Sequence, residues 1–110
     1  MTIDLVIVTH PDPSGARALV DRLVREHRIA CGHILPPGTS VFFWEGEVRT
    51  AEEVTLVLKT VPENRAEVER EIRREHPYSV PEILFVSVDH GSADYLSWVR
   101  ETCSGRPGKD

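Results

Sequence analysis

The feature that most constrains the fold is a strand-like segment near each end of the chain that is apolar on both of its faces. Residues 3–9 read IDLVIVT, and residues 83–88 read ILFVSV. Successive side chains of a strand point to opposite faces of a sheet, so apolar residues at both parities predict a strand covered on two sides. We expect residues 3–9 to form a central strand, and both segments to need cover on two faces.

Two helical segments interrupt the strand pattern. Asp12 or Ser14 can cap the first helix, which ends near His27 and carries one apolar stripe: Ala16, Leu19, Val20, Leu23 and Val24. Pro62 opens the second helix, which runs to about His76 and is rich in Glu and Arg. Its sparse apolar positions predict a surface helix, and we assign no function to its charges.

The remaining apolar runs predict a long hairpin and a short final helix. Strands are expected at three places: residues 29–35, 39–44 and 52–60. A tight turn at residues 45–46 joins the last two strands, and a helix covers residues 93–102. Residues 1–103 then form a single domain, and residues 104–110 form a flexible C-terminal tail.

The order strand, helix, strand, strand, helix, strand is the split βαβ pattern. It predicts an α+β fold, a ferredoxin-like βαββαβ sandwich with an extended β-hairpin and a short C-terminal helix. Right-handed crossovers place both main helices on the same face of the sheet. The other face is then apolar and uncovered, and residues 41–44, VFFW, add large apolar groups to the hairpin. Because burying one such side chain is worth about 1.5–3 kcal/mol, we expect a homo-oligomer.

The composition argues against several classes of partner. Eighteen acidic residues against thirteen basic ones give a net charge of -5, without the basic excess that nucleic-acid binding needs. No apolar run approaches the roughly 20 residues that cross a bilayer, and no leader pattern precedes the first strand. We expect no nucleic-acid partner, no membrane attachment and a cytoplasmic location. Cys31 and Cys103 are too few for a disulfide framework.

The sequence favours metal binding over catalysis. It has no glycine-rich phosphate loop, no G-x-S-x-G elbow and no H-E-x-x-H, so we expect no enzyme. Cys31 and His33 are two residues apart on an expected strand and share a face, where a thiolate and an imidazole suit copper or zinc. One cysteine and one histidine leave a tetrahedral site two ligands short. From spacing alone a buried structural cysteine is the simpler interpretation, unless an oligomer supplies more ligands.

Residues 76–82, HPYSVPE, are the most constrained stretch, because two prolines fix the backbone around a tyrosine and a carboxylate. They can form a rigid connection between helix and strand. They can also form a preorganised pocket wall, with Tyr78 and Glu82 facing a small molecule or ion. Trp44 can likewise fill an interface or line a pocket, and an interface is the simpler interpretation.

Several motifs occur together between Leu5 and Trp98: IAC at 29–31, SVFFWEGE at 40–47, LKT at 58–60, HPYSVPEI at 76–83 and YLSW at 95–98. In this order and at these separations they resemble the CutA divalent-cation tolerance proteins. The resemblance implies a ferredoxin-like domain in a tight homotrimer, similar in architecture to the PII signalling proteins. It also implies a role in tolerance to copper and other divalent cations, without an enzymatic reaction.

The resemblance also implies site residues. Cys31 matches the family's recurrent cysteine and is the first metal-ligand candidate, followed by His33 and His76. The expected intersubunit cleft holds five residues: Trp44, Glu53, Lys59, Tyr78 and Glu82. This chain departs from the family pattern at three positions, with Gly32 for Val, His33 for Asn and Phe42 for Tyr. Gly32 weakens the strand, His33 could strengthen a metal site, and Phe42 removes a hydroxyl from any pocket there.

The sequence thus predicts a trimeric divalent-cation tolerance protein that binds copper or another divalent metal, with no obligatory cofactor. Two alternatives stay open. One is a PII-like regulatory module that binds a small anionic ligand in the intersubunit cleft beside Lys59, with a hairpin that signals to an unidentified protein partner. The other is a structural trimeric scaffold, in which Cys31 and the HPY segment serve packing alone.

Overall fold

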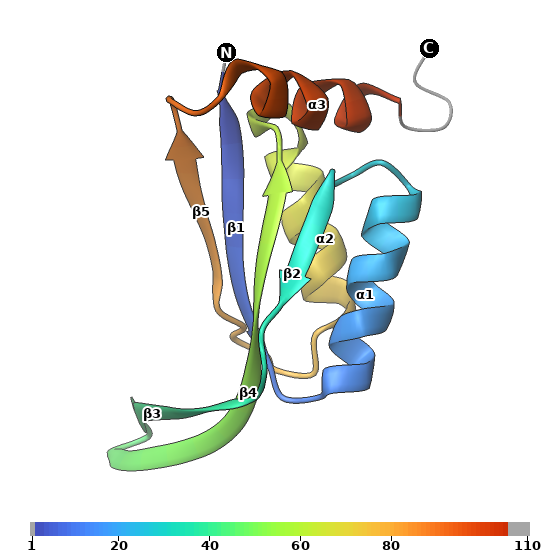
Figure 1. The fold of residues 1–110 in the computed structure, drawn as a ribbon. Helices are drawn as coiled ribbons and strands as arrows, with labels where there is room; N and C mark the ends of the chain where they lie inside the picture. The colour runs from blue at the N-terminus through green and yellow to red at the C-terminus, as the bar shows by residue number, and fades with distance from the viewer. Residues whose placement is uncertain (1, 106–110) are drawn as a thin grey trace.

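A computed structural model describes residues 2–105 of the chain. Over these residues one five-stranded antiparallel sheet combines with three α-helices (Figure 1). The elements are β1 (Ile3–His10), α1 (Pro13–Arg25), β2 (Cys31–Ile34), β3 (Gly38–Trp44), β4 (Glu47–Thr60), α2 (Arg65–Glu75), β5 (Ile83–Val88) and α3 (Ala93–Ser104). Helices α1 and α2 cover one face, α3 crosses one end of the sheet, and the β3–β4 hairpin extends at the other end (Figure 1).

The strand order is β2-β4-β1-β5, and β3 pairs with the outer half of β4. In the register of the central strands Val8 lies opposite Leu56, and on the other side of β1 Val6 lies opposite Phe85. This antiparallel order, with two helices on one face, confirms the α+β, ferredoxin-like prediction. The hairpin is also confirmed, and Glu45 and Gly46 close it with two positive φ angles, 51° and 81°, as a type I′ turn requires.

The main core lies between the helices and the sheet. Helix α1 begins where Asp12 accepts a hydrogen bond from the Ser14 amide and Pro13 occupies the first helical position, as expected of an N-terminal cap. Its apolar stripe then faces alternate residues of β1 and β4, together with two side chains of α2. The fully or almost fully buried members are Val6, Val8, Leu19, Leu23, Leu56, Leu58, Val68 and Ile72.

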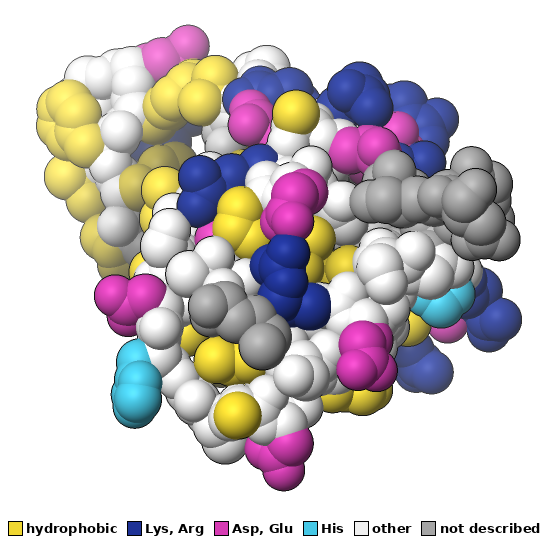
Figure 2. All heavy atoms as spheres, turned by 90° about the horizontal axis from the view of Figure 1, so that it is seen from above, with side chains coloured by type: hydrophobic (Ala, Val, Ile, Leu, Met, Phe, Trp, Pro, Cys, Tyr) yellow, Lys and Arg dark blue, Asp and Glu magenta, His cyan; other side chains and the backbone are white. Residues whose placement is uncertain are grey.

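We call the opposite side of the sheet the open face. Its end near α3 is covered, because Ile3 packs there with Ala30, Val61, Leu96, Val99 and Cys103. Farther along, Leu84 and Val86 of β5 are exposed. Seen from above, hydrophobic side chains gather on the side where the hairpin extends (Figure 2), and the exposed ones there are Val41, Phe42, Phe43, Trp44 and Val48. The expectation of an apolar face without cover inside one chain is thus confirmed.

Several boundaries differ from those expected. Strand β4 begins at Glu47 rather than at residue 52, because residues 47–51, EVRTA, pair with β3. Strand β2 is shorter than expected, and a single 3-10 turn precedes α2. Helix α3 continues through Ser104, which the sequence assigns to the tail, and residues 106–110 of that tail lie outside the described residues. No helix in residues 2–105 has the length and hydrophobicity to span a membrane.

Candidate functional site

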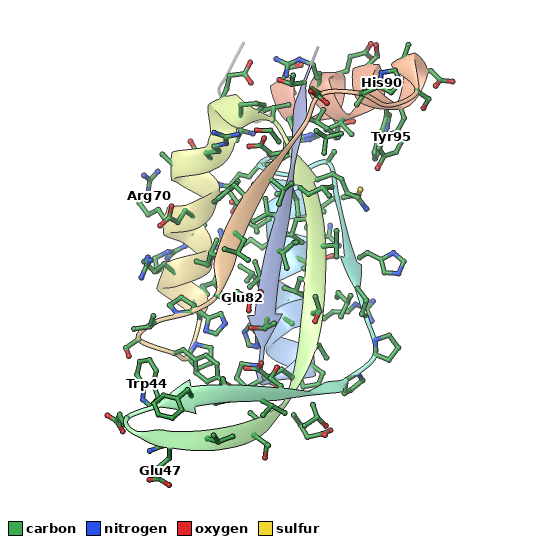
Figure 3. All side chains as sticks on the ribbon, turned by 90° about the vertical axis from the view of Figure 1, so that its left-hand side faces the viewer. Trp44, Glu47, Arg70, Glu82, His90 and Tyr95 are labelled. Carbon is green, nitrogen blue, oxygen red and sulfur yellow. The ribbon has the colours of Figure 1, made fainter. Side chains whose placement is uncertain are left out.

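A groove of about 700 Å³ lies at the foot of the open face, between the hairpin and the 76–82 segment. Four of the five predicted cleft residues line it: Trp44, Glu53, Tyr78 and Glu82. Trp44 stands on the hairpin side and Glu82 at the foot of β5, whereas Glu47 points away from the body of the molecule (Figure 3). The 76–82 segment is therefore a groove wall as well as a connection.

Glu53 is the central polar group of the groove. Its side chain comes from β4 and only 9 % of the residue is exposed. The Ser40 hydroxyl donates to Oε1 at 2.6 Å, and the Tyr78 hydroxyl donates to Oε2 at 2.8 Å. Burial raises the pKa of Tyr78, and the hydrogen bond and charge of Glu53 raise it further. These two hydrogen bonds tie the hairpin to the 76–82 segment.

Two histidines lie behind this hydrogen-bonded group. The rings of His10, His76 and Tyr78 lie in series, with centroid distances of 4.8 and 5.0 Å and tilts of 48° and 50° between neighbouring rings. His76 accepts from the Tyr78 amide through Nδ1, which leaves Nε2–H to donate to the Thr9 carbonyl at 2.6 Å. A metal at His76 would have to replace one of these bonds. Burial lowers the pKa of His10, and the neighbouring His76 lowers it further.

Cys31 and His33 share the open face, as predicted. Gly32 between them faces α1, so closely that an added Cβ would lie 2.7 Å from Val20 Cγ1. The Cys31 sulfur lies 3.5 Å from the Tyr95 hydroxyl of α3, and His33 is exposed. The hydrogen bond with Cys31, with burial and the charge of Cys31, raises the pKa of Tyr95 to about 12. Within residues 2–105 no group of three His, Cys, Asp or Glu side chains could hold a metal ion.

The structure divides the predicted site residues between two ends of β4. Lys59 lies opposite Cys31 in the register, at the α3 end of the sheet. Glu53 is six residues away along the same strand, which is about 20 Å of extended chain. His76 lies at the Glu53 end, because its neighbour His10 pairs with Val54. A single chain thus brings Cys31, His33 and Lys59 to one end and the groove residues with His76 to the other.

Among the residues of these clusters that the sequence analysis did not assign, Ser40 and Tyr95 make the hydrogen bonds to Glu53 and Cys31. Ser40 is two and four residues from Phe42 and Trp44, so strand alternation alone places it on the groove side of the hairpin. Tyr95 belongs to the YLSW motif near the C-terminus, but its contact with Cys31 spans 64 residues and no local pattern reveals it.

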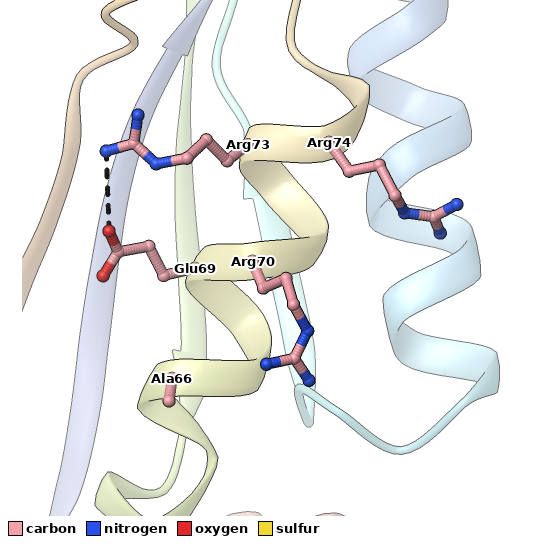
Figure 4. Close-up of a pocket in the computed structure, with 5 residues that line it drawn as sticks. All are labelled: Ala66, Glu69, Arg70, Arg73 and Arg74. Atoms are coloured by element: carbon pink, nitrogen blue, oxygen red, sulfur yellow. Dashed lines mark ion pairs between the residues drawn. The ribbon is translucent and has the colours of Figure 1, made fainter.

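A second hollow, of about 510 Å³, lies along the exposed side of α2 (Figure 4). Its residues are mostly charged, and Arg73 pairs with Glu69 across 3.5 Å. Arg74 is paired with Glu71 at 2.6 Å. As expected from the sequence, these charges belong to a solvated helix face, and we assign no site there.

The comparison with known proteins agrees with the motifs of the sequence. Residues 4–102 match the family described as CutA1 divalent ion tolerance protein. The chain belongs to this family. The divalent-cation tolerance protein CutA of Citrobacter koseri is 37 % identical over 95 residues, which are 86 % of this chain and 83 % of the relative. The CutA protein of Escherichia coli O139:H28 is 36 % identical over 95 residues, with 86 % and 85 % covered.

Solved CutA structures share the fold. The divalent cation tolerance protein from Thermus thermophilus superposes with a TM-score of 0.88 at 35 % identity, over 91 % of this chain and 97 % of that one. The protein described as periplasmic divalent cation tolerance protein CutA from Archaeoglobus fulgidus gives 0.88 at 32 % identity, over 92 % and 98 %. Membership of the CutA family of divalent-cation tolerance proteins is therefore established, and these names describe tolerance rather than a reaction.

Proposed function

We propose that this CutA family member is a homotrimer that binds a divalent metal, copper first, on the open face at Cys31 and His33. The observation that carries the proposal is the placement of a thiol and an imidazole on one face of the edge strand β2. Both ligand types suit copper and zinc. We propose a tolerance role through this binding rather than through catalysis.

An oligomer would supply what one chain lacks. Leu84 and Val86 leave apolar surface on the open face, and a second copy can cover it. In a trimer with three-fold symmetry, each of the three Cys31–His33 pairs would have the same arrangement relative to a neighbouring subunit. A neighbouring subunit could then complete a site that has only two ligands in one chain.

We also propose a cytoplasmic location. Within residues 2–105 neither Cys31 nor Cys103 forms a disulfide. A reducing compartment keeps such thiols from being oxidised, so Cys31 stays available to a metal there. Fractionation of cells that carry the untagged protein, with antibody detection, tests this location, and recovery outside the cytoplasm would contradict it.

The test of metal binding is a calorimetric titration of the reduced, tag-free protein with Cu(II) and Zn(II), and with Cu(I) delivered anaerobically through a competing chelator. Cys31→Ser and His33→Ala should each weaken a saturable binding event with a fixed ratio per trimer. His90→Ala is the matched control, because His90 is exposed but lies outside β2. Equal losses in all histidine variants, or binding that never saturates, would contradict the proposed site.

Light scattering on the same samples tests the trimer. Each variant should keep the wild-type mass, since Cys31→Ser and His33→Ala leave the large apolar side chains of the open face, Leu84 and Val86, unchanged. A monomer at micromolar concentration would contradict the assembly. Loss of metal affinity in an intact trimer would exclude the scaffold alternative.

A second candidate function has support from the groove. Four predicted cleft residues meet there beside the hairpin, as a PII-like regulatory module would require. Lys59 lies at the opposite end of β4, so within one chain it lends no positive charge to the groove. Slower hydrogen exchange of hairpin amides on addition of a small ligand, without metal, would support this candidate.

A further inference from the structure

We infer that the groove beneath the hairpin binds a small organic cation, an ammonium or guanidinium group carried on an apolar body. This inference rests on the second candidate function, a ligand in the groove, and is independent of metal binding at Cys31. It names the chemical class of that ligand from the charge and the walls of the groove.

The groove carries negative charge that basic side chains do not neutralise. Both oxygens of Glu53 accept hydrogen bonds from uncharged hydroxyls, those of Ser40 and Tyr78. Glu82 is exposed, and within residues 2–105 neither it nor Glu53 forms an ion pair with Lys or Arg. A buried carboxylate without a cation is costly to keep, so a cationic ligand gains from its charge.

Arg49 is the basic side chain among the described residues that line the groove, and it already forms ion pairs with other carboxylates. Its guanidinium lies 3.4 Å from Glu45 and 3.8 Å from Glu47, at the tip of the hairpin. It therefore screens the tip rather than Glu53. A small anion that entered the groove would lie near the carboxylates of Glu53 and Glu82. Among the described residues that line the groove, no Lys or Arg without an ion-pair partner would offset this repulsion.

Aromatic rings supply the rest of the groove. Phe42, Trp44 and Tyr78 line it, and each is still 38–41 % exposed in the single chain. The negative face of an aromatic ring attracts a cation, Trp most strongly, and the same rings can bury an apolar body. A volume of about 700 Å³ is within the range of small-molecule sites.

A divalent metal fits this groove less well than an organic cation. Metals such as Mg²⁺ and Ca²⁺ need several oxygen ligands at once. Both Glu53 oxygens already accept hydroxyl hydrogens, and the rings of Phe42 and Trp44 carry no oxygen. The hydrogen bonds to Ser40 and Tyr78 instead hold the Glu53 carboxylate in place before a ligand arrives. Such preorganisation favours recognition of one charged group at a defined position.

The test compares three probes with the same aromatic body and different charge: 2-phenylethylamine, 2-phenylethanol and phenylacetate. Calorimetry on the metal-free protein in EDTA gives the affinities, and the NMR signal of the Trp44 indole N–H, assigned with Trp44→Phe, locates the site. We expect the amine to bind at least about tenfold more tightly than the alcohol, and phenylacetate to bind weakest.

Matched variants assign the charge effect to the groove. Glu53→Gln and Glu82→Gln should each remove most of the preference for the amine over the alcohol. Glu52→Gln is the control, because Glu52 also accepts a hydroxyl hydrogen bond, from Thr39, but points to the other face of the strand. Circular dichroism and light scattering confirm that each variant folds and assembles, and the exposed Glu82 variant keeps the test valid if Glu53→Gln does not fold.

The outcomes separate this inference from the function on which it rests. Equal affinity for amine and alcohol, or preference for phenylacetate, would overturn the cationic ligand while keeping a ligand groove. Failure of all three probes in the intact assembly would overturn both, and would indicate that a neighbouring subunit occupies the groove. An amine preference unchanged in Glu53→Gln and Glu82→Gln would also overturn the inference.

Discussion

Adding a side chain at Gly32 should destabilise the fold. An ideal Cβ at this position would lie 2.7 Å from Val20 Cγ1 and 2.8 Å from Leu58 Cδ2. Non-bonded carbon atoms prefer separations of about 3.5–4.0 Å, so these groups must move apart by about 1 Å. Gly32 thus permits an unusually close approach of α1 to β2.

The cost follows from how tightly the two neighbours are packed. Val20 is 6 % exposed and Leu58 is completely buried, so neither has free space into which to move. Overpacking a core costs about 1–3 kcal/mol, and replacing a strand glycine by alanine returns about 0.5–1 kcal/mol. Gly32→Ala should therefore lower the free energy of unfolding by about 0.5–2 kcal/mol. Gly32→Val should lower it more.

Denaturant unfolding at one fixed protein concentration measures the effect, because assembly makes apparent stability concentration-dependent. Gly38→Ala is the matched control, since a Cβ at Gly38 would meet no atom within 4 Å. The double variant Gly32→Ala with Val20→Ala should lose less unfolding free energy than the sum of the two single losses, because the smaller side chain at position 20 leaves room for the new Cβ. If Gly32→Ala is as stable as the wild type, α1 can move freely and the packing argument is refuted.

Three further predictions concern hydrogen bonds and charge. Tyr78→Phe should cost about 1–3 kcal/mol of unfolding free energy in denaturant titrations, because the Glu53 carboxylate loses a hydrogen bond. Arg65→Gln should lower the thermal midpoint clearly, because the fully buried Asp4 then loses its guanidinium partner. The pKa of His10 is lowered from its ordinary value of 6.5, so its contribution to stability is complete above that pH and is lost as pH falls through the lower folded value. Unfolding between about pH 8 and about pH 5 should show this loss, and a His10→Gln variant should flatten it.

Each of these predictions has a control. Tyr95→Phe should cost less than Tyr78→Phe, because the partner of Tyr95 is a sulfur atom at 3.5 Å. Arg73→Gln breaks only an exposed ion pair, so a midpoint as low as that of Arg65→Gln would contradict the role of burial. A pH profile that is equally steep with and without His10 would assign the acid loss to other groups.

The local patterns predicted the layered part of the fold well. Apolar residues on both faces of residues 3–9 identified β1, and the stripe that begins at Ala16 identified α1, because both segments contribute buried side chains to the core. The length of β4 was underestimated, since residues 47–51, EVRTA, carry Val48 as their one large apolar side chain and become a strand by pairing with β3. That pairing depends on contacts across the hairpin rather than on the composition of the segment.

The sequence predicted the candidate site only where its residues lie close together along the chain. Strand parity correctly placed Cys31 and His33 on one face. Parity also puts Glu53 and Lys59 on one face, but the distance along β4 separates them, and only the register with β2 reveals this. The hydroxyl partners of Glu53 and Cys31 come from segments 13 to 64 residues away, beyond the reach of any local pattern.

The exposed apolar side chains of the hairpin make newly synthesised chains prone to incorrect association. Val41, Phe43 and Val48 are among its most exposed side chains, on a paired strand segment that is already complete within one molecule. Until another surface covers them, two such chains can adhere in many unproductive ways. Dilute, slow synthesis should therefore yield more usable protein than rapid overproduction, because correct encounters then compete against fewer wrong ones.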